Sequence, residues 1–358
     1  GSGPGSGLGR RWGSGPGSGF RPRRVAVVVK TTRYEFEQQR HRISDRPAGR
    51  EQHLRHLLTT KGSSYTGLLE RHHIHGRNVQ HIVDSLCEAG IEVRVVKRRD
   101  YDEETVRWAD AIVSAGGDGT MLLTASKVQD KLKPVIGVNT DPERSQGHLC
   151  LPLHFTYSFP DALRRLQSGH YRWLWRQRLR VTLEGVGINV APVDLHEEQL
   201  SLEQQRTHRS VPPTADSPLS SGPHVLPVRA LNEVFIGESL SSRASYFEIS
   251  VDGGSWEKQK NSGLNVATGT GSKAWSYNIN KLDKQEVRAV LAIARNSSSE
   301  RIDEQFVEGV TEHYNQSLVF DPEEPRMLYS IREPIVNRIF STSRHHGFAE
   351  RVSVRSRC

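Results

Sequence analysis

The sequence predicts two domains, an α/β N-terminal domain with a parallel sheet and a mainly β C-terminal domain. Between residues 25 and 138, short apolar runs alternate with helical patterns, and this alternation is typical of a parallel sheet covered by helices. After Gly169, apolar residues recur at every second position, as they do in half-buried strands. The length of 358 residues also suffices for about two domains that each bury a core.

The N-terminal α/β domain is expected at residues 25–168. Its strands are short runs rich in Val, Ile and Ala, which suit positions buried on both faces of a sheet. Its clearest helix has apolar residues at helical spacing from Val79 to Cys87, and Gly90 ends it. Residues 35–62 are polar and show no clear period. The predicted order is a strand at 25–29, a helix at 79–87, a strand at 91–96, a helix at 100–110, a strand at 111–115, a helix at 121–131 and a strand at 134–138.

The mainly β domain is expected at residues 169–358, and we expect it to be C-terminally incomplete. In residues 173–183, aromatic and aliphatic side chains alternate with arginines. Such a strand could stack nucleic-acid bases, but we favour a strand with one buried face. Residues 185–227 are rich in Pro, Ser and His and indicate a polar insertion at the surface. Further strands are expected at 226–236, 245–251, 264–267 and in the last 30 residues, with one helix at 287–294.

The composition excludes several classes of function. The longest unbroken apolar run has six residues, 289–294, whereas a membrane span needs roughly 20, so we expect no membrane partner. Three cysteines, Cys87, Cys150 and Cys358, form neither a disulfide framework nor a zinc-site spacing, which indicates a reducing compartment. A net charge of +8 could serve nucleic-acid binding, but we favour a soluble enzyme with a basic surface and no nucleic-acid partner.

Residues 1–24 are expected to be a disordered leader rich in Gly, Ser and Arg. Gly and Ser at this density cannot repay the entropy cost of ordering. Seven basic residues precede Glu35, the first acidic residue of the chain. An Arg-rich, acid-free segment is typical of a mitochondrial transit region, although so many glycines disfavour the amphipathic helix of such a region. The alternative is a linker without a targeting signal.

The sharpest functional signal is the segment GGDGT at residues 116–120. It follows a predicted strand and begins a helix, and ligands of open α/β sheets bind at the carboxyl ends of strands. Its glycines let backbone N–H groups approach a phosphate, which a helix N-terminus also favours. Asp118 would then hold the metal on the phosphates or accept the proton of an attacking hydroxyl, as phosphoryl transfer requires. The alternative is a tight turn whose glycines only satisfy the backbone.

Two further segments carry groups that suit a nucleotide. TGTGSKAW at 268–275 offers glycines, hydroxyls and a cation for a phosphate or ribose, and its Trp275 could stack on a base. Asn232 and Glu233 are an adjacent amide and carboxylate, which can bind the two vicinal hydroxyls of a ribose. Each segment also has an ordinary structural explanation, as a common turn or as the start of a strand. The chain contains neither a GxxxxGK[ST] motif nor a GxGxxG motif after a strand.

Taken together, these segments resemble the NAD kinase family. GGDGT, the Asn-Glu pair and TGTGS occur in the order and at the separations found in that family, and GVNTDPERSQGHLCLP at 137–152 is similar to a further family segment. The resemblance implies an α/β domain and a β-sandwich-like domain with the active site between them. It also implies that ATP, with Mg²⁺, phosphorylates the adenosine 2′-hydroxyl of NAD to give NADP. It further implies a homodimer located in the mitochondrial matrix.

The resemblance also implies roles for individual residues. Asp118 would be catalytic, because it would orient or deprotonate the 2′-hydroxyl. A free Asp has a pKa of about 3.9, and such a weak base suffices for a loose transition state. No metal ligand is assigned, and His72, His73 and His75 are expected to form a solvated or capping cluster. The residues implied to bind nucleotide or NAD are Gly116, Gly117, Gly119, Thr120, Leu122, Asn232, Glu233, Thr270, Gly271, Ser272, Ala274 and Trp275.

Two alternatives remain open from the sequence. Lipid kinases of the diacylglycerol and sphingosine type also carry GGDGT, although they follow it with an Asn-Glu pair where this chain has Met121-Leu122-Leu123. The second alternative is a catalytically impaired form that binds a dinucleotide without turnover. Formation of NADP from ATP and NAD distinguishes all three.

Overall fold

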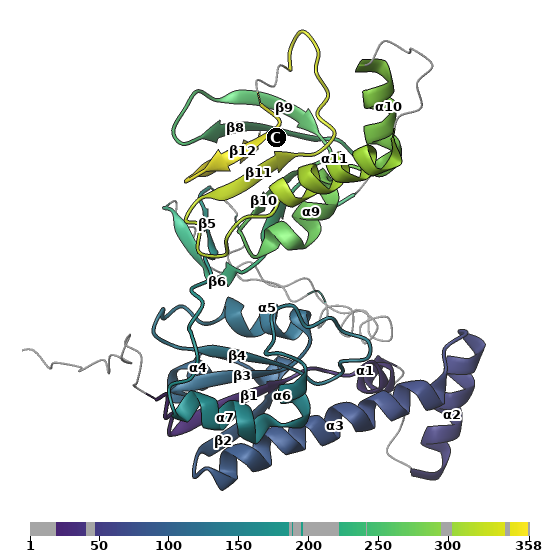
Figure 1. The fold of residues 1–358 in the computed structure, drawn as a ribbon, viewed down its shortest axis with the longest axis vertical. Coiled ribbons are helices and arrows are strands. Elements are labelled where there is room, and N and C mark those ends of the chain that lie inside the picture. The colour runs from purple at the N-terminus through teal and green to yellow at the C-terminus, as the bar shows by residue number, and fades with distance from the viewer. Residues whose placement is uncertain are drawn as a thin grey trace, which may run out of the picture. The chain divides into compact units, whose positions relative to one another are not determined.

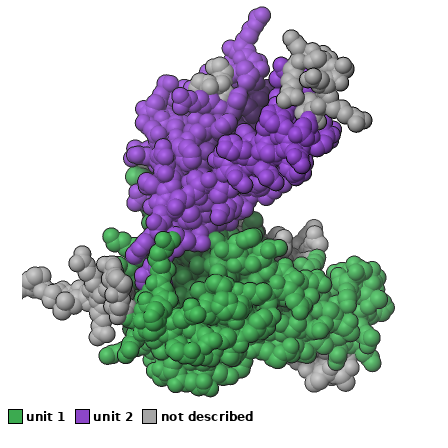
Figure 2. Space-filling model, viewed as in Figure 1, with its two compact units in different colours: residues 1–172, 181–229 green, residues 173–180, 230–358 purple. Residues whose placement is uncertain are grey.

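The computed structural model describes residues 19–40, 47–185, 188, 195, 222–240, 242–294, 303–340 and 344–356. Most of the expected leader and most of the expected polar insertion lie outside these residues. The chain divides into two compact units, coloured separately in Figure 2. The first comprises residues 1–172 and 181–229, and the second comprises residues 173–180 and 230–358. The domain boundary expected at residue 168 stays a prediction.

The first unit contains a four-stranded parallel sheet with the strand order β2-β1-β3-β4 (Figure 1). Its strands are β1 (Arg24–Val29), β2 (Glu92–Lys97), β3 (Ala111–Gly116) and β4 (Val135–Asn139). The chain leaves β1 toward β2 on one side and then crosses to β3 on the other, so the strand order reverses between β1 and β3. Open α/β sheets bind ligands at the carboxyl ends of such a pair.

The first unit also contains one 3₁₀ turn and several helices, with the bounds α1 (Arg33–Arg40), α2 (Pro47–Thr60), α3 (Tyr65–Glu88), η1 (Arg98–Asp100), α4 (Glu103–Trp108), α5 (Asp118–Ser126), α6 (His154–Tyr157) and α7 (Phe159–Gln167). The long helix α3 begins at Ser64, whose side chain accepts a hydrogen bond from the Gly67 N–H. It ends before Gly90, which has a φ of +74°. Ala26, Val28 and Ile112 of the strands share a core with Tyr101 and Val106.

The second unit contains two antiparallel sheets with the orders β12-β11-β10-β7 and β13-β8-β9. Their strands are β7 (Glu233–Ile236), β8 (Ser245–Val251), β9 (Glu257–Asn261), β10 (Leu264–Ala267), β11 (Met327–Ile331), β12 (His346–Ala349) and β13 (Val352–Ser356). Phe247 and Ile249 of one sheet share a core with Leu264, Val266 and Tyr329 of the other. Two sheets that bury a common core form a sandwich, so the predicted fold class is confirmed.

The remaining elements are a two-stranded sheet of β5 (Leu179–Leu183) and β6 (His224–Ala230), the 3₁₀ turn η2 (Gly271–Lys273), and the helices α9 (Trp275–Asn280), α10 (Lys284–Ala294) and α11 (Glu304–Ser317). Among the described residues, no helix combines the length and the apolar character that crossing a membrane requires.

Several elements differ from the sequence prediction. The strand expected over 173–183 begins only at residue 179, because the N–H groups of Trp175 and Gln177 donate to the turn at Pro322 and Glu323 instead of to a neighbouring strand. The helix expected at 121–131 starts at Asp118 and ends at Ser126. The strand expected over 226–236 is two strands, β6 and β7. Helices α1, α2, α7 and α11 and the polar strand β9 were not predicted.

Candidate active site

The glycine turn of the first unit lies at the switch point of the sheet. A cavity of about 430 Å³ opens there. It is lined by residues of β1 and the two that follow, of η1, of α5 and the glycine before it, and of the segment after β4. These are Val29, Lys30, Thr31, Arg98, Gly117, Asp118, Gly119, Thr120, Leu123 and Ser145. Two cations and the N-terminal end of a helix suit this cavity to an anionic ligand such as a phosphate chain.

Asp118 is the first residue of α5, and both of its carboxylate oxygens accept backbone hydrogen bonds. The N–H of His148 donates to Oδ2 at 3.1 Å, and the N–H of Leu149 donates to Oδ1 at 2.8 Å. These two bonds fix the plane of the carboxylate. A carboxylate offers about four lone-pair positions, so two remain for a hydroxyl or a cation.

The glycines of the turn allow β3 and α5 to meet closely. A Cβ at Gly116 would lie 2.2 Å from Oγ1 of the buried Thr120, so a larger residue would push the first turn of α5 away from the strand. Of the residues expected at the nucleotide site, Gly117, Gly119 and Thr120 line the cavity. Gly116 instead ends β3, and Leu122 lies within α5.

Cys150 lies near this site without being a nucleophile. Burial, together with the charge of Asp118, raises the pKa of its thiol to about 12. Since the thiolate is the reactive form, this cysteine stays protonated and unreactive at neutral pH.

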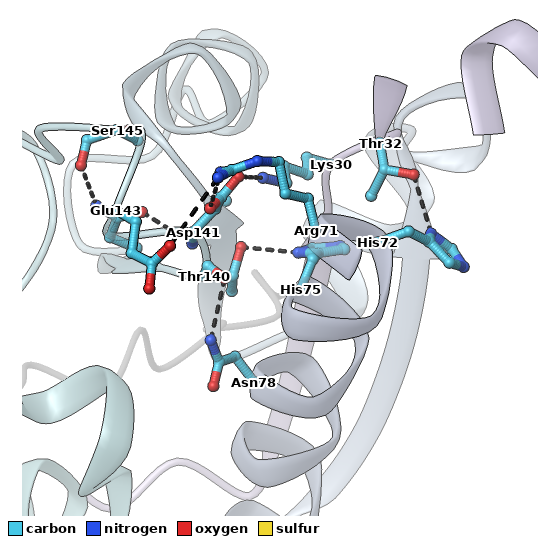
Figure 3. Close-up of polar contacts among 12 residues, drawn as sticks. Lys30, Thr32, Arg71, His72, His75, Asn78, Thr140, Asp141, Glu143 and Ser145 are labelled. Carbon is cyan, nitrogen blue, oxygen red and sulfur yellow. Dashed lines mark hydrogen bonds and ion pairs between the residues drawn. The ribbon is translucent and has the colours of Figure 1, made fainter. Parts of the chain in front are cut away.

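The sequence analysis missed a polar network between α3 and the segment that follows β4 (Figure 3). Arg71, His75 and Asn78 of α3 contact Thr140 and Asp141. The prediction of a solvated or capping cluster is wrong for His75, because this residue is only 3% exposed. Its Nδ1 atom lies 2.8 Å from Oγ1 of Thr140. The helix predicted at 79–87 begins after these three residues of α3, and only its extension back to Tyr65 places them at the spacing i, i+4 and i+7 on one face.

His75 makes the stability of the protein depend on pH. Burial lowers its pKa to about 4, and the charge of Lys30 acts in the same direction. The unfolded state, with a His pKa of about 6.5, binds the proton more tightly, so the free energy of unfolding falls as the pH drops from about 6.5 toward 4. We expect a loss of about 2 kcal/mol at pH 5 from this residue. Urea unfolding at pH 7.5 and pH 5 should show it, and His75→Gln should show a loss smaller by that amount; an equal loss in both proteins would contradict the assignment.

In the second unit, the Asn-Glu pair and the TGTGS segment lie together. The N–H and Oγ1 of Thr268 donate to the backbone carbonyl of Asn232 at 2.9 Å and 3.1 Å. A Cβ at Gly271 would lie 2.1 Å from the same oxygen. The two predicted binding segments are therefore parts of one structure.

Glu233 has the environment expected of a ligand-binding carboxylate. Its side chain is half-buried, and burial raises its pKa. Its buried Oε2 has no hydrogen-bond partner among the described residues. Buried polar atoms in folded proteins are nearly always paired, so an unpaired one indicates a bound water or ligand.

Asn265 on β10 is a second such group, which sequence reasoning did not identify. Its side chain is fully buried, and neither amide atom has a partner in the described part of the chain. Asn265 is opposite Phe235 and Ala267 is opposite Glu233, so Asn265 and Glu233 lie on the same face of the sheet. An amide inside the otherwise apolar strand LNVA was the available signal.

The other predicted residues of this unit hold the turn together or lie at its surface. Ser272 Oγ donates to the carbonyl of Gly269 at 2.7 Å and accepts from the N–H of Phe320 at 3.2 Å. Thr270 Oγ1 accepts from Arg176 at 3.0 Å. Trp275 is 41% exposed, and the centroid of its ring lies 5.0 Å from the centroid of the Phe235 ring. Ala274 is the residue that precedes α9.

Comparison with known proteins gives consistent matches. Residues 25–144 match the family described as the ATP-NAD kinase N-terminal domain. The chain is 64% identical over 349 residues to NAD kinase 2, mitochondrial, of Rattus norvegicus, covering 97% of this chain and 81% of the relative. It is also 64% identical over 349 residues to NAD kinase 2, mitochondrial, of Homo sapiens, covering 97% and 78%. Among solved structures, an NAD kinase from Archaeoglobus fulgidus in complex with ATP aligns with a TM-score of 0.43 at 15% identity, covering 91% of this chain and 76% of that one.

Proposed function

Since the chain belongs to the NAD kinase family, and therefore transfers a phosphoryl group from ATP to NAD to form NADP, we propose that Asp118 is its catalytic residue. The observation that carries this proposal is the position of Asp118. It stands at the switch point of the sheet, in a cavity lined by two cations, with its carboxylate held by two N–H groups.

In the proposed mechanism, Asp118 orients the adenosine 2′-hydroxyl of NAD and accepts its proton late in the reaction. Phosphoryl transfer through a loose transition state demands positioning and charge neutralisation more than a strong base. A carboxylate fixed by two hydrogen bonds retains lone pairs that can accept the hydroxyl proton. The hydroxyl oxygen then bonds to the terminal phosphorus of ATP while the bond from that phosphorus to the leaving ADP oxygen breaks.

The phosphates of the nucleotide are proposed to lie against the turn that begins α5. Gly117, Gly119 and Thr120 would present backbone groups to them, and Lys30 and Arg98 line the same cavity. The helix N-terminus and the cations oppose the negative charge that the donor carries into the site. Gly116 and Leu122 would shape the turn rather than contact phosphate directly.

The residues of this cavity fit a magnesium ion that arrives with ATP. Mg²⁺ commonly binds one or two carboxylates together with substrate phosphates and retained waters, and Asp118 is such a carboxylate. Among the described residues, no cluster of three or more His, Cys, Asp or Glu side chains forms a separate metal site. When bound, Mg²⁺ would neutralise charge on the phosphates.

The second unit is proposed to hold NAD. Asn232 and Glu233 would bind ribose hydroxyls, which supplies the partner that the buried Oε2 of Glu233 lacks. Thr270, Gly271, Ser272 and Ala274 would shape the turn beside them, and the exposed face of Trp275 would stack on a base of the dinucleotide.

Glu233→Gln is expected to raise the KM for NAD by about tenfold or more, because it removes a charged acceptor worth about 1.5–3 kcal/mol. The KM for ATP should stay within about twofold, since Glu233 is proposed to contact NAD alone. Steady-state assays in which each substrate is varied give both constants. Glu312→Gln on the exposed surface of α11 is the matched control. Equal rises in both KM values would argue against a role specific to NAD.

The assay that tests the function itself is formation of NADP from ATP, NAD and Mg²⁺, with diacylglycerol offered as a competing acceptor. The lipid-kinase and impaired-form alternatives are not favoured, because the 64% identity to two NAD kinases extends over 97% of the chain. Phosphorylation of the lipid would support the lipid-kinase alternative. Binding of NAD without formation of NADP would support the impaired form.

The proposal also covers where the protein is located in the cell and how many chains it contains. The protein is mitochondrial, like the NAD kinase 2 of rat and human that it matches, and we propose that it lies in the matrix. We further propose a homodimer, as the family resemblance implies. Light scattering behind a sizing column checks this directly, since a dimer has twice the chain mass of 40.3 kDa.

A further inference from the structure

One face of α3 binds two consecutive residues of the segment that follows β4 (Figure 3). Arg71, His75 and Asn78 project from the same side of the helix because they are four and three residues apart. Arg71 Nη1 lies 3.2 Å from Asp141 Oδ1, and His75 Nδ1 lies 2.8 Å from Thr140 Oγ1. Asn78 Nδ2 donates to the carbonyl of Thr140 at 3.0 Å. Successive turns of one long helix thus fix the backbone at this point.

A second cation reaches Asp141 from the end of β1. Lys30 Nζ lies 3.4 Å from Oδ2, so each carboxylate oxygen of Asp141 faces a different cation. The side chains of Lys30, Arg71 and Asp141 are only 24%, 22% and 13% exposed, so solvent and salt screen these pairs less than surface ion pairs. Removing either cation leaves the Asp141 carboxylate with one positive partner instead of two, and removing Asp141 leaves Lys30 without this carboxylate. We call these three residues the anchor triad.

The segment that Asp141 anchors also contacts the side chain of Asp118. The N–H groups of Arg144 and Ser145 both donate to the carbonyl of Asp141, and Asn139 Nδ2 donates to the carbonyl of Ser145 at 2.8 Å. A few residues later, the same segment supplies the two N–H groups that hold the Asp118 carboxylate. These contacts, together with the short stretch of backbone between Ser145 and His148, join α3 to Asp118, which lines the cavity.

We propose that the anchor triad is a positioning device for Asp118. It fixes residues 141–149 so that the N–H groups of His148 and Leu149 keep the carboxylate in one orientation. The inference rests on the catalytic role proposed for Asp118. Arg71 lies outside the set of described residues that line the cavity, so it acts through the segment and is a positioning residue. Displacement of a reacting group by about 1 Å can cost about 100-fold in rate.

Four variants test this inference. Arg71→Met removes the charge and keeps an apolar stem, whereas Asp141→Asn removes the charge of the partner at nearly constant size. Arg71→Lys keeps a cation that can reach Asp141. Arg164→Met is the matched control, because it breaks an exposed ion pair with Asp161 on α7 of the same unit.

We expect Arg71→Met and Asp141→Asn each to lower kcat by about 10- to 100-fold while the KM values for NAD and ATP stay within about threefold. Because Arg71→Lys keeps a positive charge opposite Asp141, it should recover kcat to within about threefold of the wild-type value. Arg164→Met should leave kcat and both KM values unchanged, as expected for an exposed ion pair.

Hydrogen exchange reports the proposed link directly. In Arg71→Met and Asp141→Asn, the amides of His148 and Leu149 should exchange at least about tenfold faster than in the wild type. They should be unaffected in Arg164→Met. In an Asp118→Asn background, adding Arg71→Met should lower kcat little further, because the triad acts through that carboxylate.

Unchanged kcat in folded Arg71→Met and Asp141→Asn overturns the inference, and so does unchanged exchange at the two amides. Full additivity with Asp118→Asn overturns it as well, since the triad would then affect turnover by another route. The proposed function fails by a separate result, in which Asp118→Asn alone retains wild-type kcat. The two failures are therefore distinguishable.

Discussion

Replacing Asp118 by Asn is expected to lower kcat by at least about 100-fold, within the range that a positioned general base contributes. The change removes the proposed proton acceptor and places an amide N–H₂ against one of the N–H groups that now donate to the carboxylate. The KM for NAD should change by only about threefold, because the ribose and the base are proposed to bind mainly through the second unit. Single-turnover measurements with saturating ATP separate the chemical step from binding.

The control for this prediction is Asp84→Asn. Asp84 is exposed on α3 and accepts a hydrogen bond from Gln80, so the same chemical change there should leave kcat unaffected. Far-ultraviolet circular dichroism establishes that both variants are folded. If Asp118→Asn folds and turns over at the wild-type rate, Asp118 has no part in the chemistry.

Gly271→Ala is expected to have the largest structural effect among the residues proposed to bind NAD. The added Cβ would lie 2.1 Å from the carbonyl oxygen of Asn232 and 2.6 Å from its carbonyl carbon. Neither atom belongs to a flexible side chain, so the backbone that carries Asn232 and Glu233 has to move. We expect the free energy of unfolding to fall by about 3 kcal/mol, the upper end for overpacking a well-packed site. We also expect NAD affinity to fall.

Gly309→Ala supplies the comparison for that substitution. Gly309 is exposed within α11, and a Cβ there meets nothing within 4 Å. The change should raise the free energy of unfolding by about 0.5–1 kcal/mol, because Ala loses less conformational entropy in a helix than Gly does. Urea unfolding and calorimetric titration with NAD measure both variants. A Gly271→Ala protein with wild-type stability would show that the turn can open without cost.

The sequence predicts this fold well where neighbouring residues determine the structure. The strands of the parallel sheet are short runs of apolar, mostly β-branched residues, and Gly116 and Gly117 mark the turn after one of them. The GGDGT segment thus places Asp118 at a strand end without any tertiary information. Helices α1 and α2 were not predicted because they bury few side chains, so their sequences show little apolar periodicity. In α2, the main buried side chains are Leu54 and Leu58.

Contacts between distant residues explain what the sequence could not supply. Arg71 and Asp141 are 70 positions apart, and nothing local to either residue indicates the other. The buried His75 likewise contacts Thr140, which lies 65 positions away along the chain. Asn265 shows the same limit, since only the register of β10 against β7 reveals that its amide shares a face with Glu233.

The division of the chain has a consequence for how the protein can be dissected. The backbone passes between the two units at residues 172–173, 180–181 and 229–230, so three covalent links join them. A single proteolytic cut at any one of these links leaves the halves tethered by the other two. A fragment that stops at residue 172 also lacks 181–229, so neither unit corresponds to one uninterrupted stretch of the gene. Studies of each half in isolation therefore call for a circularly rearranged or spliced polypeptide rather than a simple truncation.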